Sequence, residues 1–78
     1  SITNKSMQDR AERMLSAMFE YFMRRPECLP EAYLRLSDEA PREQIICDYL
    51  SGMTDRYAIN VFEALFIPEN FSLGGVTV

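Results

Sequence analysis

The 78-residue sequence contains no histidine, and this absence restricts the chemistry that the chain can perform. Histidine is the commonest general base of enzymes and the commonest protein ligand of metal ions. The two cysteines, Cys28 and Cys47, do not have the spacing of a zinc site. The motifs of phosphate-binding loops, dinucleotide-binding turns, nucleophile elbows and zinc proteases are absent as well. The residues therefore predict no catalytic group, no metal site and no cofactor within this chain.

Long apolar runs are also absent, since no segment approaches the ~20 apolar residues of a membrane-spanning helix. The opening residues 1–6 are polar and short, unlike a signal peptide. Two cysteines do not make a disulfide framework, so both are predicted to be reduced thiols of a cytoplasmic protein. The formal net charge of −4 disfavours nucleic acid as a partner. We therefore expect a cytoplasmic chain that binds neither membrane nor nucleic acid.

The overall composition of the chain predicts one small globular domain, residues 1–78. Hydrophobic residues make up 47% and charged residues 26% of the chain, a balance typical of folded proteins. A chain of this length buries only about 60% of the surface that its unfolded form exposes. Its stability in isolation is therefore expected to be small, unless it self-associates or belongs to a larger protein.

Apolar residues recur at helical spacing in two long segments, with a shorter helical segment between them. The first, about 6–25, has one apolar stripe and ends before Pro26. A short helix is predicted at about 30–36 and a second long helix at about 41–66. Residues 67–78 are expected to form a tail. The prediction is an all-α fold, a small helical hairpin or bundle of two long helices with a short connecting helix and an irregular C-terminal tail.

The predicted helix at 41–66 carries apolar residues on more than one side, which indicates burial on more than one side. Two helices and a short third one cannot cover such a wide surface. Either the chain dimerises, or another part of a longer protein covers this helix.

The segment Cys47–Ala58, CDYLSGMTDRYA, places charged residues inside this predicted helix. Asp48 and Asp55 are seven residues apart, so on one continuous helix they share a face, with α-carbons ~10 Å apart. That separation is too large for two carboxylates that share a proton, or for a metal ion held by the pair alone. A self-contained hydrolase based on the two aspartates is the weakest functional hypothesis.

Tyr49 and Arg56 share the neighbouring face of the same predicted helix. Together with the two aspartates they are candidates for binding a substrate or another protein surface. The alternative is a solvated face with tyrosines in the core. Glycine costs about 1 kcal/mol relative to alanine inside a helix. Gly52 and Met53 therefore indicate close packing against another helix, with the close approach of a ligand as the alternative.

The stretch Ile46–Ala58, ICDYLSGMTDRYA, closely resembles the C-terminal signature of deoxyguanosine triphosphate triphosphohydrolases. These are the dGTPase-like members of the HD-domain phosphohydrolase superfamily. The preceding helix and its proline-bearing link, Arg25–Pro30, fit the same family. The resemblance covers about Asp9 to Phe66, and its most specific part is GMTDRYA. HD enzymes hold their metal with histidines and aspartates of an upstream helical core, and without histidine this chain can supply none of the histidine ligands.

The resemblance implies a C-terminal fragment of a larger enzyme that hydrolyses dGTP or another dNTP to the deoxynucleoside and triphosphate. A divalent metal is expected in the parent enzyme and not in this chain. The fragment is expected to cover the missing HD core, to provide subunit contacts in a homo-oligomer, and to support the substrate site. Arg56 would contact a nucleotide phosphate or a carboxylate of the core, and Tyr49 would stack or hydrogen-bond beside it. Asp48 and Asp55 would orient basic groups of the core.

The alternative hypothesis is a stand-alone helical module that dimerises, or binds another protein, through the wide apolar face of 41–66. For the enzyme fragment we expect an upstream His-Asp pair in the parent gene and no nucleotide hydrolysis by these residues alone. For the stand-alone module we expect a natural chain that starts close to Ser1.

Overall fold

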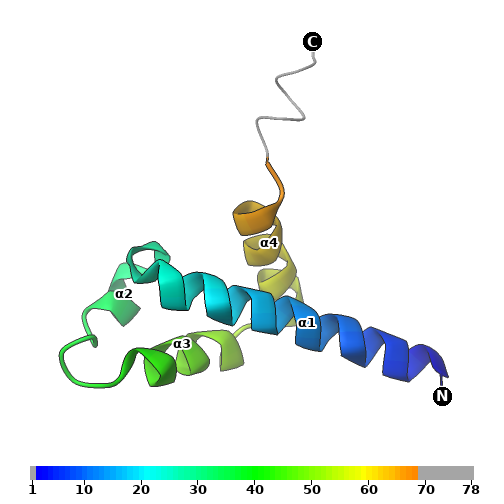
Figure 1. Cartoon of the computed structure of the whole chain (residues 1–78), viewed down its shortest axis with the longest axis horizontal. Helices are drawn as coiled ribbons and strands as arrows, with labels where there is room; N and C mark the ends of the chain where they lie inside the picture. The colour runs from blue at the N-terminus through cyan, green and yellow to red at the C-terminus, as the bar shows by residue number, and fades with distance from the viewer. Residues whose placement is uncertain (1, 69–78) are drawn as a thin grey trace, which may run out of the picture.

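The computed structural model describes residues 2–68, with side chains from residue 5 onward. Its elements are α1 (Ile2–Arg24), the 3-10 turn η1 (Pro26–Cys28), α2 (Glu31–Leu34), α3 (Arg42–Ser51) and α4 (Asp55–Phe66) (Figure 1). No strand occurs among the described residues, and the predicted all-α class is confirmed. The predicted tail lies, from residue 69 onward, outside the described part of the chain.

Helices α1 and α3 run side by side in opposite directions and hold most of the core (Figure 1). The apolar stripe of α1 buries Met18 and Phe22, which are 0% and 1% exposed. At the end of α1, Nη1 of Arg42 donates a hydrogen bond of 3.0 Å to the carbonyl oxygen of Met23. The last carbonyl groups of a helix lack partners within the helix. The side chain of Arg42 therefore satisfies one of them and ties the end of α1 to the start of α3.

The prediction of one long helix at 41–66 is wrong, because the chain breaks the helix between Ser51 and Asp55. Gly52 forms the C-cap of α3, and Thr54 forms the N-cap of α4. The hydroxyl oxygen of Thr54 accepts a hydrogen bond of 3.1 Å from the backbone N–H of Tyr57. Threonine is a favoured N-cap residue, and Asp55 in the first turn suits the positive end of the helix dipole. These local capping interactions therefore end one helix and start the next, although the apolar pattern continues through the break.

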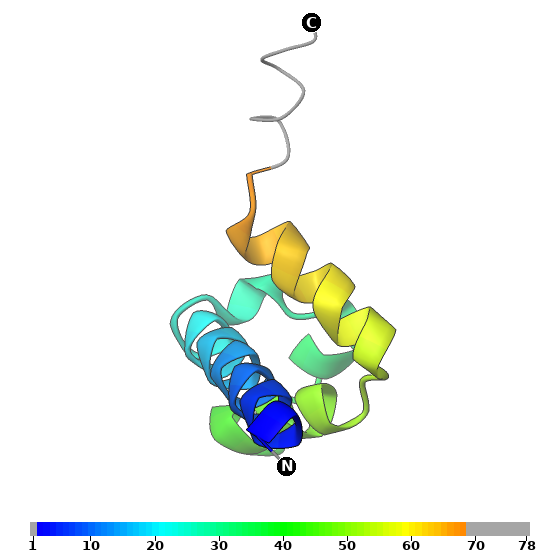
Figure 2. The same ribbon diagram turned by 90° about the vertical axis from the view of Figure 1, so that its right-hand side faces the viewer.

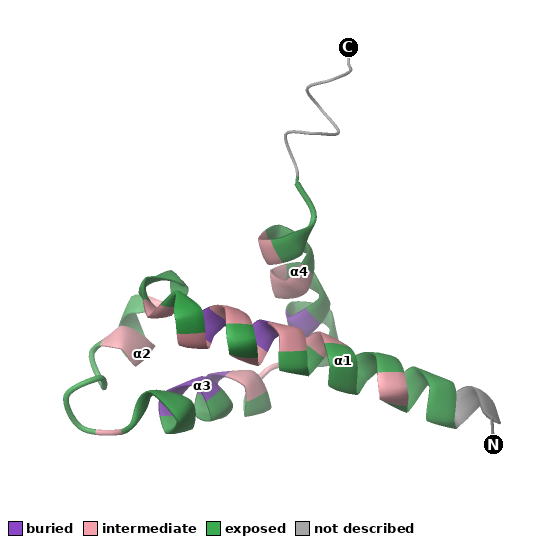
Figure 3. Ribbon diagram, in the orientation of Figure 1, coloured by how far each residue is buried: buried purple, intermediate pink, exposed green. Residues whose placement is uncertain are grey.

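The break sends α4 away from α3 and across α1, as the two perpendicular views show (Figures 1 and 2). The predicted hairpin of two long helices is therefore replaced by an antiparallel pair, α1 and α3, on which α4 packs along its length, through Ala58, Val61, Phe62 and Leu65. Ala58 is the buried residue of α4 (Figure 3). The core residues are Met18, Phe22, Leu29, Ile45, Ile46, Tyr49 and Ala58.

Several large apolar side chains of α4 remain exposed, as the wide stripe of the sequence indicated. Ile59 and Phe66 of α4 are 44% and 40% exposed, and Ile67, the C-cap of α4, is 54% exposed. No described helix combines the length and the apolar character required to cross a lipid bilayer. Within residues 5–68 one salt bridge forms, between Arg35 and Glu31 at 3.7 Å.

Candidate functional site

A cluster of three tyrosines forms where α3 gives way to α4. The hydroxyl groups of Tyr49 and Tyr57 lie 3.0 Å apart and share a hydrogen bond. The ring of Tyr33, on α2, is tilted against that of Tyr49 at 5.0 Å between centroids. On a continuous helix, residues eight positions apart are separated by ~12 Å of rise. The break at residues 52–54 therefore brings Tyr49 and Tyr57 together, and sequence periodicity could not predict this contact.

Tyr49 is the most buried member of the cluster, with 8% of its surface exposed. Its burial raises the pKa of the phenol well above the ordinary value, and the hydrogen bond with Tyr57 raises that pKa further. Tyr49 therefore stays protonated at neutral pH and acts as a hydrogen-bonding core residue. Phe22 contacts its ring edge to face, at 5.6 Å between centroids, from the α1 side.

A cleft of about 320 Å³ opens beside these tyrosines. Its volume lies at the lower end of the range for small-molecule pockets. Three of the predicted site residues line it, namely Tyr49, Gly52 and Met53. Four further lining residues were not predicted: Pro30, Tyr33, Thr54 and Tyr57. For Thr54 and Tyr57 the sequence signal was the Thr-Asp pair at residues 54–55, which is typical of a helix start, whereas Pro30 and Tyr33 reach the cleft only through the tertiary fold.

Asp48, Asp55 and Arg56 do not line this cleft, and all three are exposed. The predicted shared face of Asp48 and Asp55 is wrong, because the two aspartates lie on different helices. None of the three forms a salt bridge with another described side chain. In the described part of the chain, no group of three acidic, cysteine or histidine residues is arranged to hold a metal ion.

Gly52 has open space around it. A methyl group added there would meet only carbonyl oxygens of its own helix, those of Asp48 at 3.6 Å and Tyr49 at 3.8 Å. These are ordinary van der Waals distances, so no other described segment requires glycine at this position. Close packing at Gly52 stays a prediction that concerns a surface outside the described chain. Met53 is half-buried and packs against the core.

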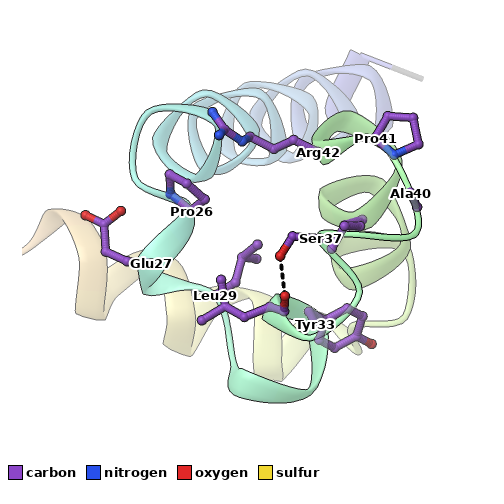
Figure 4. A pocket seen from close by; sticks show the side chains of 10 residues that line it. Pro26, Glu27, Leu29, Tyr33, Ser37, Ala40, Pro41 and Arg42 are labelled. Atoms are coloured by element: carbon purple, nitrogen blue, oxygen red, sulfur yellow. Dashed lines mark hydrogen bonds between the residues drawn. The ribbon is translucent and has the colours of Figure 1, made fainter.

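A second, larger cavity of about 520 Å³ lies between the end of α1, α2 and the start of α3 (Figure 4). Leu29, Leu34 and Ile45 contribute apolar walls, and Arg42 extends toward the end of α1. The hydroxyl of Ser37 donates a hydrogen bond to the carbonyl oxygen of Leu34. Tyr33 lines this cavity as well as the cleft near Gly52. None of the predicted site residues lines this larger cavity.

The described chain is all-α and carries an aromatic cleft at the α3–α4 corner. Residues 2–64 match the family described as the phosphohydrolase-associated domain. Because this match covers most of the sequence, the chain belongs to the phosphohydrolase-associated domain family.

Curated relatives agree with this assignment. The chain is 44% identical over 62 residues to a deoxyguanosinetriphosphate triphosphohydrolase-like protein of Geobacter sulfurreducens, with 80% of this chain and 16% of that protein covered. A protein with the same description from Caulobacter vibrioides is 45% identical over 62 residues, with 76% and 16% covered. A third, from Caldanaerobacter subterraneus, is 33% identical over 65 residues, with 83% and 19% covered. The chain thus spans less than a fifth of these relatives. No solved structure matches it.

Proposed function

We propose that this chain is the C-terminal part of a metal-dependent dNTP triphosphohydrolase of the cytoplasm, with dGTP as the expected substrate. The observation that carries the proposal is the 44% identity to a relative named as a dGTP triphosphohydrolase-like protein, of which the chain spans 16%. A metal-binding catalytic core would lie in the remaining length of such a protein. The present chain, without histidine, would serve that core from outside.

We assign the candidate residues to two roles, according to their burial. Tyr49 is buried and hydrogen-bonded, so it supports the α3–α4 corner and does not offer a free ring to a substrate. Asp48, Asp55 and Arg56 are exposed near the same corner. We propose that these three charges contact the catalytic core, a neighbouring subunit or a nucleotide phosphate. Arg56 is the residue suited to a phosphate or a carboxylate, because a guanidinium binds either in a bidentate manner.

The test is Arg56→Ala in the full-length parent enzyme. Loss of a charge-assisted hydrogen bond costs about 1.5–3 kcal/mol, so kcat/KM should fall about tenfold or more if Arg56 contacts phosphate. If Arg56 contacts protein, the oligomeric state or the thermal stability should change instead. The matched control is Arg35→Ala, which removes an exposed guanidinium whose partner is Glu31. Unchanged kcat, KM, stability and oligomeric state in Arg56→Ala would contradict both roles.

A second candidate function is a stand-alone helical module that binds a partner, and the exposed Ile59 and Phe66 of α4 and Ile67 directly after it favour this function. The two candidate functions predict different reading frames upstream of the region that encodes this chain. An upstream His-Asp pair in the same reading frame supports the enzyme, and a reading frame that begins at this domain supports the module. Hydrolysis of dGTP by the full-length product, measured by release of triphosphate, provides the biochemical arm of the test.

A further inference from the structure

A hollow of about 340 Å³ lies where α4 meets the middle of α1. Its floor is apolar and half-buried, formed by Met14 and Ala17 of α1 and Phe62 of α4. Two exposed arginines, Arg10 and Arg13, complete its lining, and no carboxylate lines it. We call this feature the arginine hollow. Its apolar floor and cationic rim suit an apolar side chain that is flanked by acids.

The two arginines have no ionic partner in the described part of the chain. Asp9 precedes Arg13 by one helical turn, a spacing that often gives a salt bridge, but none forms between them. Arg10 likewise forms no salt bridge with any described carboxylate. A guanidinium beside an apolar floor pairs well with a carboxylate, because it is weakly hydrated and offers a fork of donors. The rim is therefore available to an external acid.

The turn between α2 and α3 carries the complementary chemistry. Leu36 is 38% exposed although it is apolar, and Asp38 and Glu39 beside it are exposed as well. Backbone hydrogen bonds from the N–H groups of Glu39 and Ala40 to the carbonyl oxygen of Leu36, at 2.8 and 3.1 Å, shape this turn. We call Leu36, Asp38 and Glu39 the acidic turn. It presents one apolar side chain and two carboxylates, which match one apolar hollow and two guanidinium groups.

The hollow and the turn lie apart in the molecule, so the chain does not fill its own hollow. The turn lies at the end of the molecule where α2 leads into α3, whereas Arg10 and Arg13 belong to the half of α1 nearer its N-terminus (Figure 1). The charges are divided in the same way. Residues 5–25 contain five basic and three acidic side chains, whereas residues 26–51 contain two basic and six acidic side chains. A second copy can bring its acidic half to the basic half of the first.

We propose that the acidic turn of a second copy of this chain docks in the arginine hollow, with Leu36 against Phe62 and the two carboxylates paired with Arg10 and Arg13. This inference deepens the subunit-contact part of the proposed function and rests on that part alone. The occupant is a second copy because charge complementarity and the apolar match come from the chain's own surface.

The test is sedimentation velocity of the 78-residue chain over a wide range of concentration, at low and high salt. We expect association that strengthens with concentration and weakens as salt rises. Reversal of both hollow charges, Arg10→Glu with Arg13→Glu, should weaken association about tenfold or more, because close interfacial charge pairs couple strongly. The matched control is Arg24→Glu with Arg25→Glu, which reverses two exposed arginines outside this hollow, the last residue of α1 and the residue after it.

A mixing experiment separates the proposed contact from damage to the fold. A second variant, Asp38→Arg with Glu39→Arg, should associate as weakly as the hollow variant when each is alone. Mixed together, the basic turn of one variant meets the acidic hollow of the other, and association should return to within about twofold of the natural chain. Circular dichroism checks that each variant keeps its helices.

A chain that stays monomeric at every concentration overturns the inference, and so does association that ignores the charge reversals or is not rescued by mixing. If the hollow instead binds the acidic surface of a different protein, the isolated chain stays monomeric. That outcome also contradicts the proposal. Hydrolysis of dGTP by the full-length parent is measured separately. If hydrolysis is found while the chain is monomeric, the proposed function stands and this inference alone fails.

Discussion

At the scale of single residues, Tyr49 shows how one side chain can serve the core and a polar contact together. Its ring packs against Phe22 and Tyr33, and its hydroxyl shares a hydrogen bond with Tyr57. Burying a phenol without a partner would cost free energy, and the Tyr57 hydroxyl removes that cost. Tyr49 therefore belongs to the structural frame of the corner, whereas the charged residues near it, Asp48, Asp55 and Arg56, are exposed.

Because of Tyr49, the stability of the chain should decrease at alkaline pH. Its pKa is raised in the folded state, so above about pH 10 the unfolded phenol ionises while the folded phenol keeps its proton. The unfolded state then binds fewer protons, and the free energy of unfolding falls as pH rises. In Tyr49→Phe this fall should be shallower, as measured by urea unfolding at neutral and alkaline pH. Tyr33→Phe, which leaves Tyr49 in place, is the control, and parallel pH curves for Tyr49→Phe and the natural chain would contradict the assignment.

At the scale of elements, the decisive feature is the break between α3 and α4. Residues 52–54 end one helix and begin the next, and α4 turns toward α1 as a result (Figure 1). The turn lets Ala58 enter the core and brings Tyr57 to Tyr49. It also creates the hollow between α1 and α4. The position of α4 thus depends on a short local signal, namely the hydroxyl group of Thr54 and the carboxylate of Asp55 in the first turn of α4.

Loss of the Thr54 cap should destabilise α4. In Thr54→Ala the N–H of Tyr57 loses the acceptor that lies 3.1 Å away, and removal of an N-cap costs about 0.5–2 kcal/mol. The measurement is the free energy of unfolding by urea, followed by far-ultraviolet circular dichroism. Thr54→Ser keeps a hydroxyl acceptor and should behave like the natural chain. Equal stability of Thr54→Ala and Thr54→Ser would mean that the cap contributes nothing.

At the scale of the whole molecule, the chain corresponds to a small part of the relatives it matches and leaves apolar surface uncovered. The chain covers less than a fifth of the relatives it matches, and apolar side chains of α4 stay exposed. The exposed charges Asp48, Asp55 and Arg56 and the open space at Gly52 lie near the same α3–α4 corner. We infer that this corner faces the remainder of the protein, and Gly52 allows that to be tested.

The substitution Gly52→Ala should have opposite effects in the isolated chain and in the parent. In the chain, Gly52 has φ −87° and ψ −1°, which alanine adopts readily, and its added methyl group meets only ordinary contacts. The lower entropy of the unfolded state should then stabilise the chain by about 0.4–1 kcal/mol, measured by urea unfolding. In the parent, close packing on Gly52 should make the same substitution reduce activity or assembly. Asn60→Ala is the exposed control, and a parent unaffected by Gly52→Ala would show that nothing packs closely there.

Much of the fold followed from the sequence because its causes are local. Helical spacing of apolar residues predicted the all-α class and the first helix, and Pro26 marked its end, since proline cannot continue a helix. The absence of histidine excluded a histidine-bearing metal site from this chain, and the GMTDRYA stretch indicated the family to which the chain belongs. Each of these inferences needs only neighbouring residues or composition.

The arrangement of the site depended on tertiary structure, because it is set by which helices cross. Asp48 and Asp55 would share a face only on an unbroken helix, and Thr54 breaks it. The contacts of Tyr49 with Tyr57 and Tyr33 join three helices, so no periodicity within one segment could predict them. The sequence by itself determined the helical class and the family. The fold decided which charged residues remain exposed and which tyrosines are buried, because burial depends on the packing of segments that are distant along the chain.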